Sequence, residues 1–362
     1  MSAPDPLIDP RVPVTILTGF LGSGKTTVLN RLLRKPSLAG AAVIVNEFGS
    51  VGLDHLLIEA SEEQFTLLDN GCVCCTVRGD LVATLKELDR KSSIGETPPL
   101  TKVIIETTGL ADPAPILHTL MAEAELSARF RIGGVVTTVD AVNSAATLDR
   151  HPEAAKQVAV ADRLLITKTD LIPDDELREL THRLGRLAPA VEPAIARNGE
   201  VDPDLLASLP ADAAADFTRI AMRLEAVGHR DHDCGPHCRH HDHHHRDAHH
   251  GIQSFSFVID KAVEWGAFAR WLDYVAALKG EDLLRFKGLV HVADDPERPL
   301  VLHGVQHVFH PPARLDRWPS ADRRSRLVFI VRNIERETIA RTLVKFAAID
   351  AASLAAPALA AA

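Results

Sequence analysis

The sequence predicts an α/β protein in which a parallel sheet, covered by helices on both faces, is followed by a smaller α+β domain. Short apolar runs alternate with segments of helical periodicity up to about residue 215, which is the pattern of a parallel sheet. Polar and glycine residues gather where the apolar runs end, as they do at the ligand-binding edge of such sheets. A histidine-rich stretch then interrupts the chain, and further apolar runs and helices follow it. We therefore expect a first domain over residues 1–215, a linker over 216–251, a second domain over 252–350 and an alanine-rich tail over 351–362.

The composition is that of a globular protein and argues against several classes of function. Of the 362 residues, 46% are hydrophobic and 25% are charged, and the formal net charge is -9. The basic residues form no long run, so nucleic acid is not an expected partner. Residues 1–6 lack the basic start and apolar core of a signal peptide, and the tail is too short to span a bilayer. We expect a cytoplasmic protein without a membrane partner, whose five cysteines serve metal or redox chemistry rather than disulfides.

The stretch GFLGSGKT, residues 19–26, reads as a phosphate-binding loop. It follows an apolar run over 12–18 that suits a buried strand, and it precedes helical periodicity over 27–34. The glycines free backbone N–H groups to surround phosphate oxygens, and the helix N-terminus adds a favourable dipole. Lys25 would reach the terminal phosphates, and the Thr26 hydroxyl would ligate Mg²⁺. A glycine-rich turn that binds no nucleotide is the alternative, which the flanking strand and helix disfavour.

A second predicted strand, over residues 41–45, runs into the polar loop 46–54. In proteins with a phosphate-binding loop, this is where a γ-phosphate and its Mg²⁺ order a switch segment. Glu47 and Asp54 are therefore candidate sensors or metal-bound carboxylates, and Asp54 is also a candidate catalytic residue. A solvated loop with two surface acids is the alternative.

Three of the five cysteines, Cys72, Cys74 and Cys75, lie close together in the chain. Helical periodicity over 77–90 begins just after them, so we expect thiols near a helix N-terminus, which favours the thiolate. Thiolates bind Zn²⁺ and similar ions, but three thiols leave a tetrahedral site one ligand short. Glu47, a histidine, water or a partner's residue could supply that ligand. The incomplete cluster suggests a metal that exchanges; buried small side chains or a redox thiol are the alternatives.

Two further apolar runs end in residues that suit nucleotide chemistry. One ends in an ExxG pattern, in which Glu106 would face Mg²⁺ or the attacking water and Gly109 would let the backbone approach the γ-phosphate. The other, over 163–166, leads into Thr-Lys-Thr-Asp, close to the guanine-reading Asn-Lys-x-Asp. Asp170 would accept hydrogen bonds from guanine, and the stem of Lys168 would pack on its ring.

The first position of that guanine-reading pattern is changed in this chain. Thr167 stands where Asn is usual, while the Lys and Asp that choose the base are present. GTP therefore stays the favoured nucleotide, with a less strict preference over ATP. A plain strand-to-helix turn is the alternative, because Asp and Thr also cap helices.

Residues 229–250 hold ten histidines and two cysteines in twenty-two positions. No apolar periodicity occurs there, so we expect a flexible loop. Neutral imidazoles would bind Zn²⁺, Co²⁺ or Ni²⁺ in interchangeable arrangements, and a solvated polar linker is the alternative. The candidate ligands are His237, His240, His241, His243, His244 and His245.

The remainder of the chain predicts a small α+β domain. A strand over 252–259 and a helix over 265–278 come first, and a last helix begins at about residue 335. His303 and His307 are interpreted as strand or edge histidines rather than as metal ligands. The strands between the two helices are predicted over 283–292, 300–305 and 326–332.

Taken together, these motifs resemble the CobW family of metallochaperone GTPases. GFLGSGKTT, VNEFGSVGLD, GCVCCTVRGDL, IIETTGLADP and TKTD occur in that family's order, and GEDLLRFKGLVHV with HGVQHVF is similar to its C-terminal domain. The resemblance extends from residue 13 to about 346, and Cys-x-Cys-Cys is its most diagnostic element. The candidate nucleotide residues are Gly22, Ser23, Gly24, Lys25, Thr26, Thr27, Gly109, Lys168 and Asp170; the catalytic candidates are Lys25, Asp54 and Glu106; the metal residues are Cys72, Cys74 and Cys75 with Glu47.

The resemblance implies a GTPase that binds a transition metal and delivers it to a client metalloprotein. Its cofactors would be GTP and Mg²⁺, and its metal Zn²⁺, or alternatively Co²⁺ for cobalamin synthesis or hydratase activation. We expect Mg²⁺-GTP to complete a tight metal site and hydrolysis to loosen it. Slow intrinsic hydrolysis is expected because no arginine finger can be assigned. A metal buffer regulated by nucleotide and a small-molecule kinase are the competing interpretations, and homo-oligomer formation stays open.

Overall fold

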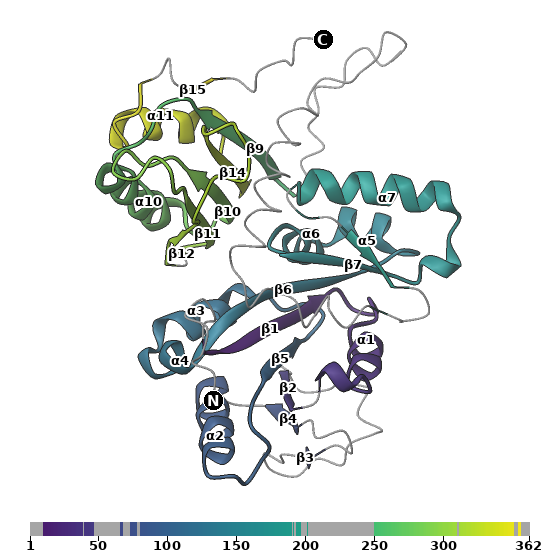
Figure 1. Cartoon of the computed structure of the whole chain (residues 1–362). Helices are drawn as coiled ribbons and strands as arrows, with labels where there is room; N and C mark the ends of the chain where they lie inside the picture. The colour runs from purple at the N-terminus through teal and green to yellow at the C-terminus, as the bar shows by residue number, and fades with distance from the viewer. Residues whose placement is uncertain are drawn as a thin grey trace. The chain divides into compact units, whose positions relative to one another are not determined.

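The computed structural model describes residues 10–38, 40–46, 66–67, 73–77, 80–189, 191, 193–196, 201, 250–309, 311–350 and 354–355. The chain divides into two compact units, residues 1–181 with 191–212 and residues 182–190 with 213–362. Figure 1 labels the helices and strands of both units. The domain boundaries expected from the sequence stay predictions.

The first unit is built on a sheet that is parallel in all but one of its described pairings. Its strands are β1 (Val12–Gly19), β2 (Ala41–Asn46), β3 (Thr66–Leu67), β4 (Val73–Val77), β5 (Lys102–Thr107), β6 (Phe130–Asp140), β7 (Arg163–Thr167) and β8 (Pro193–Ile195). They are ordered β3-β4-β2-β5-β1-β6-β7-β8, and only β3 with β4 is antiparallel. β1 therefore lies between β5 and β6, and its neighbours come from distant parts of the sequence.

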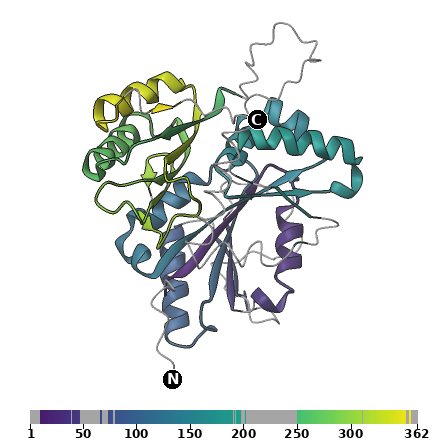
Figure 2. The ribbon, with the colours of Figure 1, turned by 45° about the horizontal axis from the view of Figure 1, so that its top comes forward.

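Helices cover both faces of this sheet, as predicted. They are α1 (Lys25–Leu32), α2 (Leu81–Ser93), α3 (Ala114–Ala122), α4 (Ala124–Arg129), α5 (Ser144–Arg150), α6 (Pro152–Ala159) and α7 (Asp174–Leu187). Figures 1 and 2 both show α1 on one side of the sheet and α2 on the other. The apolar stripe of α1, which includes Val28 and Leu32, is buried against Leu17, Val43 and Ile104 of three neighbouring strands. This packing of α1 on the sheet holds the first turn of the helix close to the end of β1.

The segment around the cysteines differs from the sequence prediction. Helical periodicity was expected from residue 77, but β4 extends to Val77 and α2 begins at Leu81. Asp80 caps that helix, because its Oδ1 accepts a 2.8 Å hydrogen bond from the Val82 N–H. Cys74 and Cys75 therefore lie within a strand, and the predicted start of the helix at residue 77 is wrong.

In its described residues, the second unit carries an antiparallel sheet packed against helices. Its elements are β9 (Ile252–Ile259), α10 (Trp265–Lys279), β10 (Leu283–Val290), β11 (Leu300–Val305), β12 (Val308–Phe309), β13 (Ala313–Arg314), β14 (Ser325–Arg332), α11 (Arg336–Phe346) and β15 (Leu354–Ala355). The strands are ordered β12-β11-β10-β14-β9-β15, with β13 also on β11. Phe268 and Trp271 of α10 are fully buried against Phe286 and Phe329 of the sheet. An α+β second domain was predicted, and this architecture confirms it.

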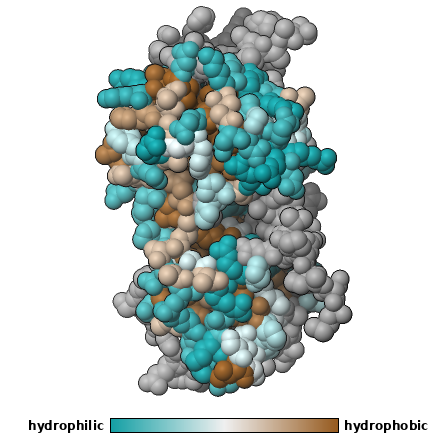
Figure 3. Space-filling view, turned by 60° about the vertical axis from the view of Figure 1, so that its left-hand side comes forward, coloured by the Kyte–Doolittle hydropathy of each residue, from teal (hydrophilic) through white to brown (hydrophobic). Residues whose placement is uncertain are grey.

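The face shown in Figure 3 mixes polar residues with smaller apolar patches. In the second unit, Tyr274 and Leu278 of α10 and Val344 and Phe346 of α11 are exposed, and the Tyr274 and Phe346 rings lie 4.5 Å apart. None of the helices in the described part of the chain has the length and apolar character that crossing a membrane requires.

Candidate functional site

The loop between β1 and α1 has the backbone that a phosphate-binding loop needs. Gly22 and Gly24 have φ angles of 71° and 90°, in the left-handed region that side chains rarely adopt. The Ser23 N–H closes a turn on the Phe20 carbonyl oxygen at 3.1 Å. Since Gly24 stands at the N-cap of α1 and has no side chain to cap it, the first N–H groups of the helix can meet an anion.

Neighbouring strands hold this loop from the side. The hydroxyls of Ser23 and Thr138 are 2.6 Å apart, and the Thr167 hydroxyl donates to the Ser23 carbonyl oxygen at 2.8 Å. A Cβ on Gly19 would lie 2.5 Å from the Thr138 carbonyl oxygen, so β6 leaves no space for a side chain there. The loop is therefore fixed by the ends of β6 and β7 as well as by its own turn.

Lys25 lies buried inside the loop. Its Nζ donates to the carbonyl oxygens of Gly19 at 2.9 Å and Phe20 at 3.2 Å. Burial lowers the pKa of Lys25, and the charge of Glu106 partly opposes this. An ammonium held in this way is suited to neutralising phosphate oxygens, and the predicted role of Lys25 at the terminal phosphates stays a prediction.

Thr26 and Glu106 meet at the start of α1 and the end of β5. The Thr26 hydroxyl donates a 2.7 Å hydrogen bond to Glu106 Oε1. Glu106 is in register with Leu17 of β1, and its carboxylate is buried. A hydroxyl and a carboxylate are the hard oxygen ligands that Mg²⁺ prefers, so this pair fits that ion.

The turn after β5 packs closely against the phosphate-binding loop. A Cβ on Gly109 would lie 2.6 Å from the Leu21 nitrogen, which means that only glycine fits at this position. The structure thus brings the turn close to the loop, while the predicted approach of the Gly109 backbone to a γ-phosphate stays a prediction. Gly22–Thr27, Glu106 and Gly109 are thus gathered at one edge of the sheet.

Lys168 reaches the same edge from the end of β7. It adopts a left-handed conformation, with φ at 57°, and its Nζ donates to Asp140 Oδ2 at 2.7 Å. Burial alone would raise the pKa of Asp140, but hydrogen bonds from Lys168, Asn143 and the Val142 N–H lower it below its ordinary value. Asp170, the predicted guanine reader, is exposed on the short turn directly after Lys168.

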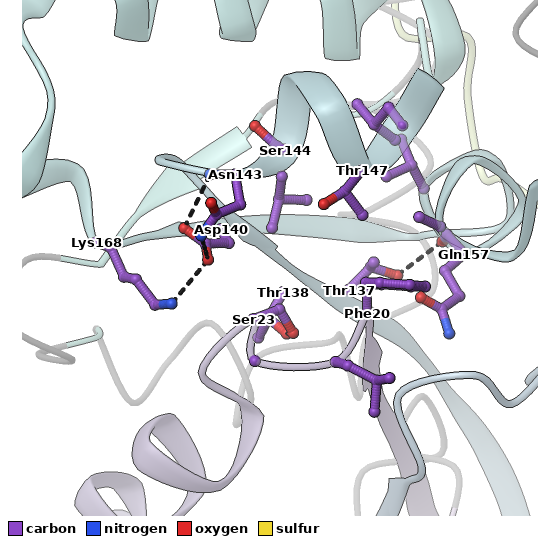
Figure 4. Close-up of a pocket in the computed structure, with 16 residues that line it drawn as sticks. Phe20, Ser23, Thr137, Thr138, Asp140, Asn143, Ser144, Thr147, Gln157 and Lys168 are labelled. Carbon is purple, nitrogen blue, oxygen red and sulfur yellow. Dashed lines mark hydrogen bonds and ion pairs between the residues drawn. The ribbon is translucent and has the colours of Figure 1, made fainter. Parts of the chain in front are cut away.

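A cavity of about 210 Å³ adjoins the phosphate-binding loop. Phe20–Ser23, the end of β6, Lys168 and residues of α5 and α6 line it, whereas Lys25, Thr26 and Glu106 do not. Figure 4 shows the labelled lining residues on one side of the loop, with α1 starting on the other side. The cavity therefore adjoins the phosphate site rather than containing it.

Several predicted site residues fall outside the described part of the chain. These are Glu47, Asp54, Cys72 and the six histidines His237, His240, His241, His243, His244 and His245. The backbone of Cys74 and Cys75 is described, and these residues pair with Val43 and Ile44 of β2. Among the described residues, no three metal-binding side chains come together. The proposed metal ligands stay predictions.

The sequence analysis missed three residues that build this edge. Asp140 accepts a hydrogen bond from Lys168, the Asn143 side-chain amide donates to Asp140, and Gln157 of α6 contacts the turn that contains Gly109. Asp140 could have been found, because it directly follows the predicted strand over 132–139, at the edge where the other motifs lie. Gln157 gave no such signal, since it lies within an ordinary helical pattern.

Comparisons with known proteins agree with this geometry. The family model described as CobW/HypB/UreG, nucleotide-binding domain, matches residues 13–193, and the cobalamin synthesis protein cobW C-terminal domain matches residues 252–347. The chain is 32% identical over 330 residues to the zinc chaperone YjiA of Escherichia coli (strain K12), covering 91% of this chain and 96% of that protein. It is 30% identical over 327 residues to the zinc chaperone CobW of a Sinorhizobium species, covering 80% and 84%. A crystal structure of the Zn(II)-bound YjiA GTPase from E. coli is similar with a TM-score of 0.72 and 29% identity, covering 93% of this chain and 99% of that one.

Proposed function

We propose that this chain, which belongs to the CobW/HypB/UreG family and carries a CobW C-terminal domain, is a GTP-hydrolysing metal chaperone. Its cargo would be a transition metal, zinc first, which it would transfer to a client metalloprotein. The zinc chaperones among its relatives support zinc as the metal. The client, and cobalt as an alternative cargo, rest on the sequence alone.

One observation supports a coupling between nucleotide binding and metal binding. β2 pairs with both β4 and β5, so that Val45 stands in register with Thr76 on one side and Glu106 on the other. Cys75 precedes Thr76 directly, which puts the cysteine strand two strands from the carboxylate beside Thr26. At about 4.8 Å per strand, that separation is roughly 10 Å. The backbone of Cys75 therefore lies near the carboxylate that would hold Mg²⁺, and this nearness supports a link between the metal and the nucleotide.

The residues of the nucleotide site have separate roles in this proposal. Lys25 would neutralise the terminal phosphates, and Asp170 with Lys168 would hold the guanine. Thr26 and Glu106 would hold Mg²⁺, which supplies charge neutralisation to the phosphates when it is bound. Glu106 would also orient the attacking water. Hydrolysis is expected to be slow without a partner that contributes a further cation.

The metal would bind through Cys72, Cys74 and Cys75, with Glu47 as a candidate fourth ligand. Binding of GTP would order the segments after β2 and around β4 and so complete the site. The histidine-rich stretch would collect ions at lower affinity. Hydrolysis would then loosen the tight site and release the ion.

The proposal is tested by titrating Zn²⁺, and separately Co²⁺, against a chromophoric chelator. Each titration is run with a Mg²⁺-GTP analogue, with Mg²⁺-GDP and without nucleotide. A one-equivalent site should tighten at least about tenfold with the GTP analogue, equivalent to about 1.4 kcal/mol of coupling. Equal metal affinity in all three nucleotide states would contradict the proposal and favour the interpretation as a metal buffer. The ion that binds more tightly indicates the cargo.

A further inference from the structure

The turn after β5 is a short, tightly packed structure. The Ala111 N–H donates to the Thr108 carbonyl oxygen at 3.1 Å, which closes the turn. Thr107, just before it, donates its hydroxyl to the Thr18 hydroxyl of β1 at 2.8 Å. On the loop side, Gly109 has no space for a side chain next to Leu21. The turn therefore cannot move toward the phosphate-binding loop without a clash.

Gln157 holds this turn from its other side. Its side chain is 1% exposed, and its Nε2 donates to the carbonyl oxygens of Gly109 at 3.1 Å and Ala111 at 3.0 Å. The orientation of the amide is set, because only its nitrogen can donate to two carbonyl oxygens. Each peptide unit is planar, so fixing the Gly109 carbonyl also fixes the direction of the Leu110 N–H. One side chain thus sets the planes of two peptide units in the turn.

The helix that presents Gln157 is itself secured at the same place. The Thr137 hydroxyl of β6 donates to the backbone oxygen of Gln157 at 2.8 Å, a contact drawn in Figure 4. The adjacent Lys156 forms a 2.6 Å ion pair with Asp112, whose other oxygen accepts from the Ala114 N–H at the start of α3. Two consecutive residues of α6 therefore hold the turn and the segment that follows it.

We infer that Gln157 is a positioning residue that keeps the Gly109 turn in place for the γ-phosphate. This inference rests on the proposed GTPase function. A turn fixed between Leu21 and α6 presents its backbone at a constant position, which matters only for a nucleotide that carries the third phosphate. Gln157 should therefore govern the preference for GTP over GDP and the rate of hydrolysis, while it leaves GDP binding alone.

Gln157→Leu tests this with little change in packing volume. The buried Oε1 of Gln157 has no hydrogen-bond partner among the described residues, so its removal offsets part of the loss of the two donated bonds. We expect the affinity for a Mg²⁺-GTP analogue to fall about tenfold and that for Mg²⁺-GDP to change by less than about twofold. The turnover number for GTP should fall with the analogue affinity. Thr84→Val is the matched control, because Thr84 is also buried but bonds within α2.

Gln157→Glu adds a second measurement, the pH dependence of the preference for the GTP analogue. A purely structural role of Gln157 would not change this pH dependence. The carboxylate of the variant would face two carbonyl oxygens and could donate only when protonated, and burial would raise its pKa. Preference for the GTP analogue should be lost at high pH and partly return as the pH falls. If Gln157→Leu does not fold, Lys156→Met replaces it as the test, because Lys156 is partly exposed. This variant should weaken the preference for the GTP analogue by a smaller factor.

The outcomes separate this inference from the proposed function. If the wild-type chain neither prefers the GTP analogue nor hydrolyses GTP, the GTPase proposal fails and the inference fails with it. If the wild type does both and Gln157→Leu keeps its preference, the inference alone is overturned. Equal loss of GTP-analogue and GDP affinity, together with a lower melting temperature, would also overturn it, because it would show a purely structural role.

Discussion

The Thr26 hydroxyl donates a 2.7 Å hydrogen bond to Oε1 of Glu106, joining the first turn of α1 to the end of β5. The two residues are eighty positions apart in the sequence, yet both lie beside Lys25 at one edge of the sheet. The Glu106 carboxylate counters the charge of the Lys25 ammonium, and in the proposed function it would also be a ligand for Mg²⁺. Its charge should therefore matter more than its size.

Glu106→Gln keeps the size and the hydrogen-bond acceptor but removes the charge. We expect the rate of GTP hydrolysis to fall by about 100-fold or more, in line with the loss of a general base or metal ligand. GDP binding in the absence of Mg²⁺ should change little. Phosphate release in single-turnover experiments measures the first effect, with the surface variant Glu123→Gln as control. An unchanged rate would remove Glu106 from the proposed mechanism.

Thr167→Val removes the hydroxyl that bonds to the Ser23 carbonyl oxygen. Thr167 is buried, so the loss should lower the free energy of unfolding by about 1 kcal/mol and weaken GTP binding. Urea unfolding and nucleotide titration measure the two effects. Thr181→Val is a suitable control, because the Thr181 hydroxyl bonds at the exposed surface of α7. If the free energy of unfolding falls and GTP affinity stays normal, Thr167 has only a structural role.

Asp140→Asn should reduce stability in a pH-dependent way. Hydrogen bonds from Lys168, Asn143 and the Val142 N–H lower the pKa of Asp140 against the effect of burial. A lowered pKa in the folded state means that the carboxylate contributes stability above the unfolded pKa, about 3.9, and loses it as the pH falls further. The difference in unfolding free energy between wild type and variant should be constant from pH 6 to about 8 and shrink below about pH 4. A difference that does not depend on pH would contradict this account.

Cys72→Ser should abolish the tight metal site and leave GTP binding nearly intact. The reason is that, in the proposed function, the thiolate ligands would act on the metal only, whereas the phosphates would contact the loop before α1. Chelator competition and nucleotide titration of the same preparation measure both properties. Cys238→Ser, in the histidine-rich stretch, is the matched control and should keep the tight site. Loss of GTP binding in Cys72→Ser would contradict the separation of roles.

Elements with a clear apolar period could be predicted closely from the sequence. The strands over 252–259 and 300–305 have the predicted bounds, because polar and glycine residues end each apolar run. The helix after the cysteines was placed too early, at residue 77. Apolar residues around Val77 fit a strand as well as a helix, and pairing with β2 decided in favour of the strand. Asp80, a good N-cap residue, was the local signal for the true start.

The site was predictable only where one short motif contains the chemistry. Lys25 and Thr26 follow from the loop motif, and Glu106 from the end of an apolar run. Asp140 and Gln157 act through partners that are distant in the sequence, directly after β7 and in the turn after β5. Such pairings depend on strand order, which no local pattern in a single sequence records.

The central position of β1 has a consequence for synthesis of the chain. Leu17 pairs with Glu106, and Gly19 pairs with Thr138, so both sides of the strand stay without partners while much of the domain is still being made. Parallel pairing over such separations is slow to form, and an apolar strand left without partners is prone to aggregate. A nascent chain released between β5 and β6 would carry the whole loop motif, the cysteines and the ExxG pattern. It would still lack the strand that shapes the loop, so we expect nucleotide binding only after β6 has been made.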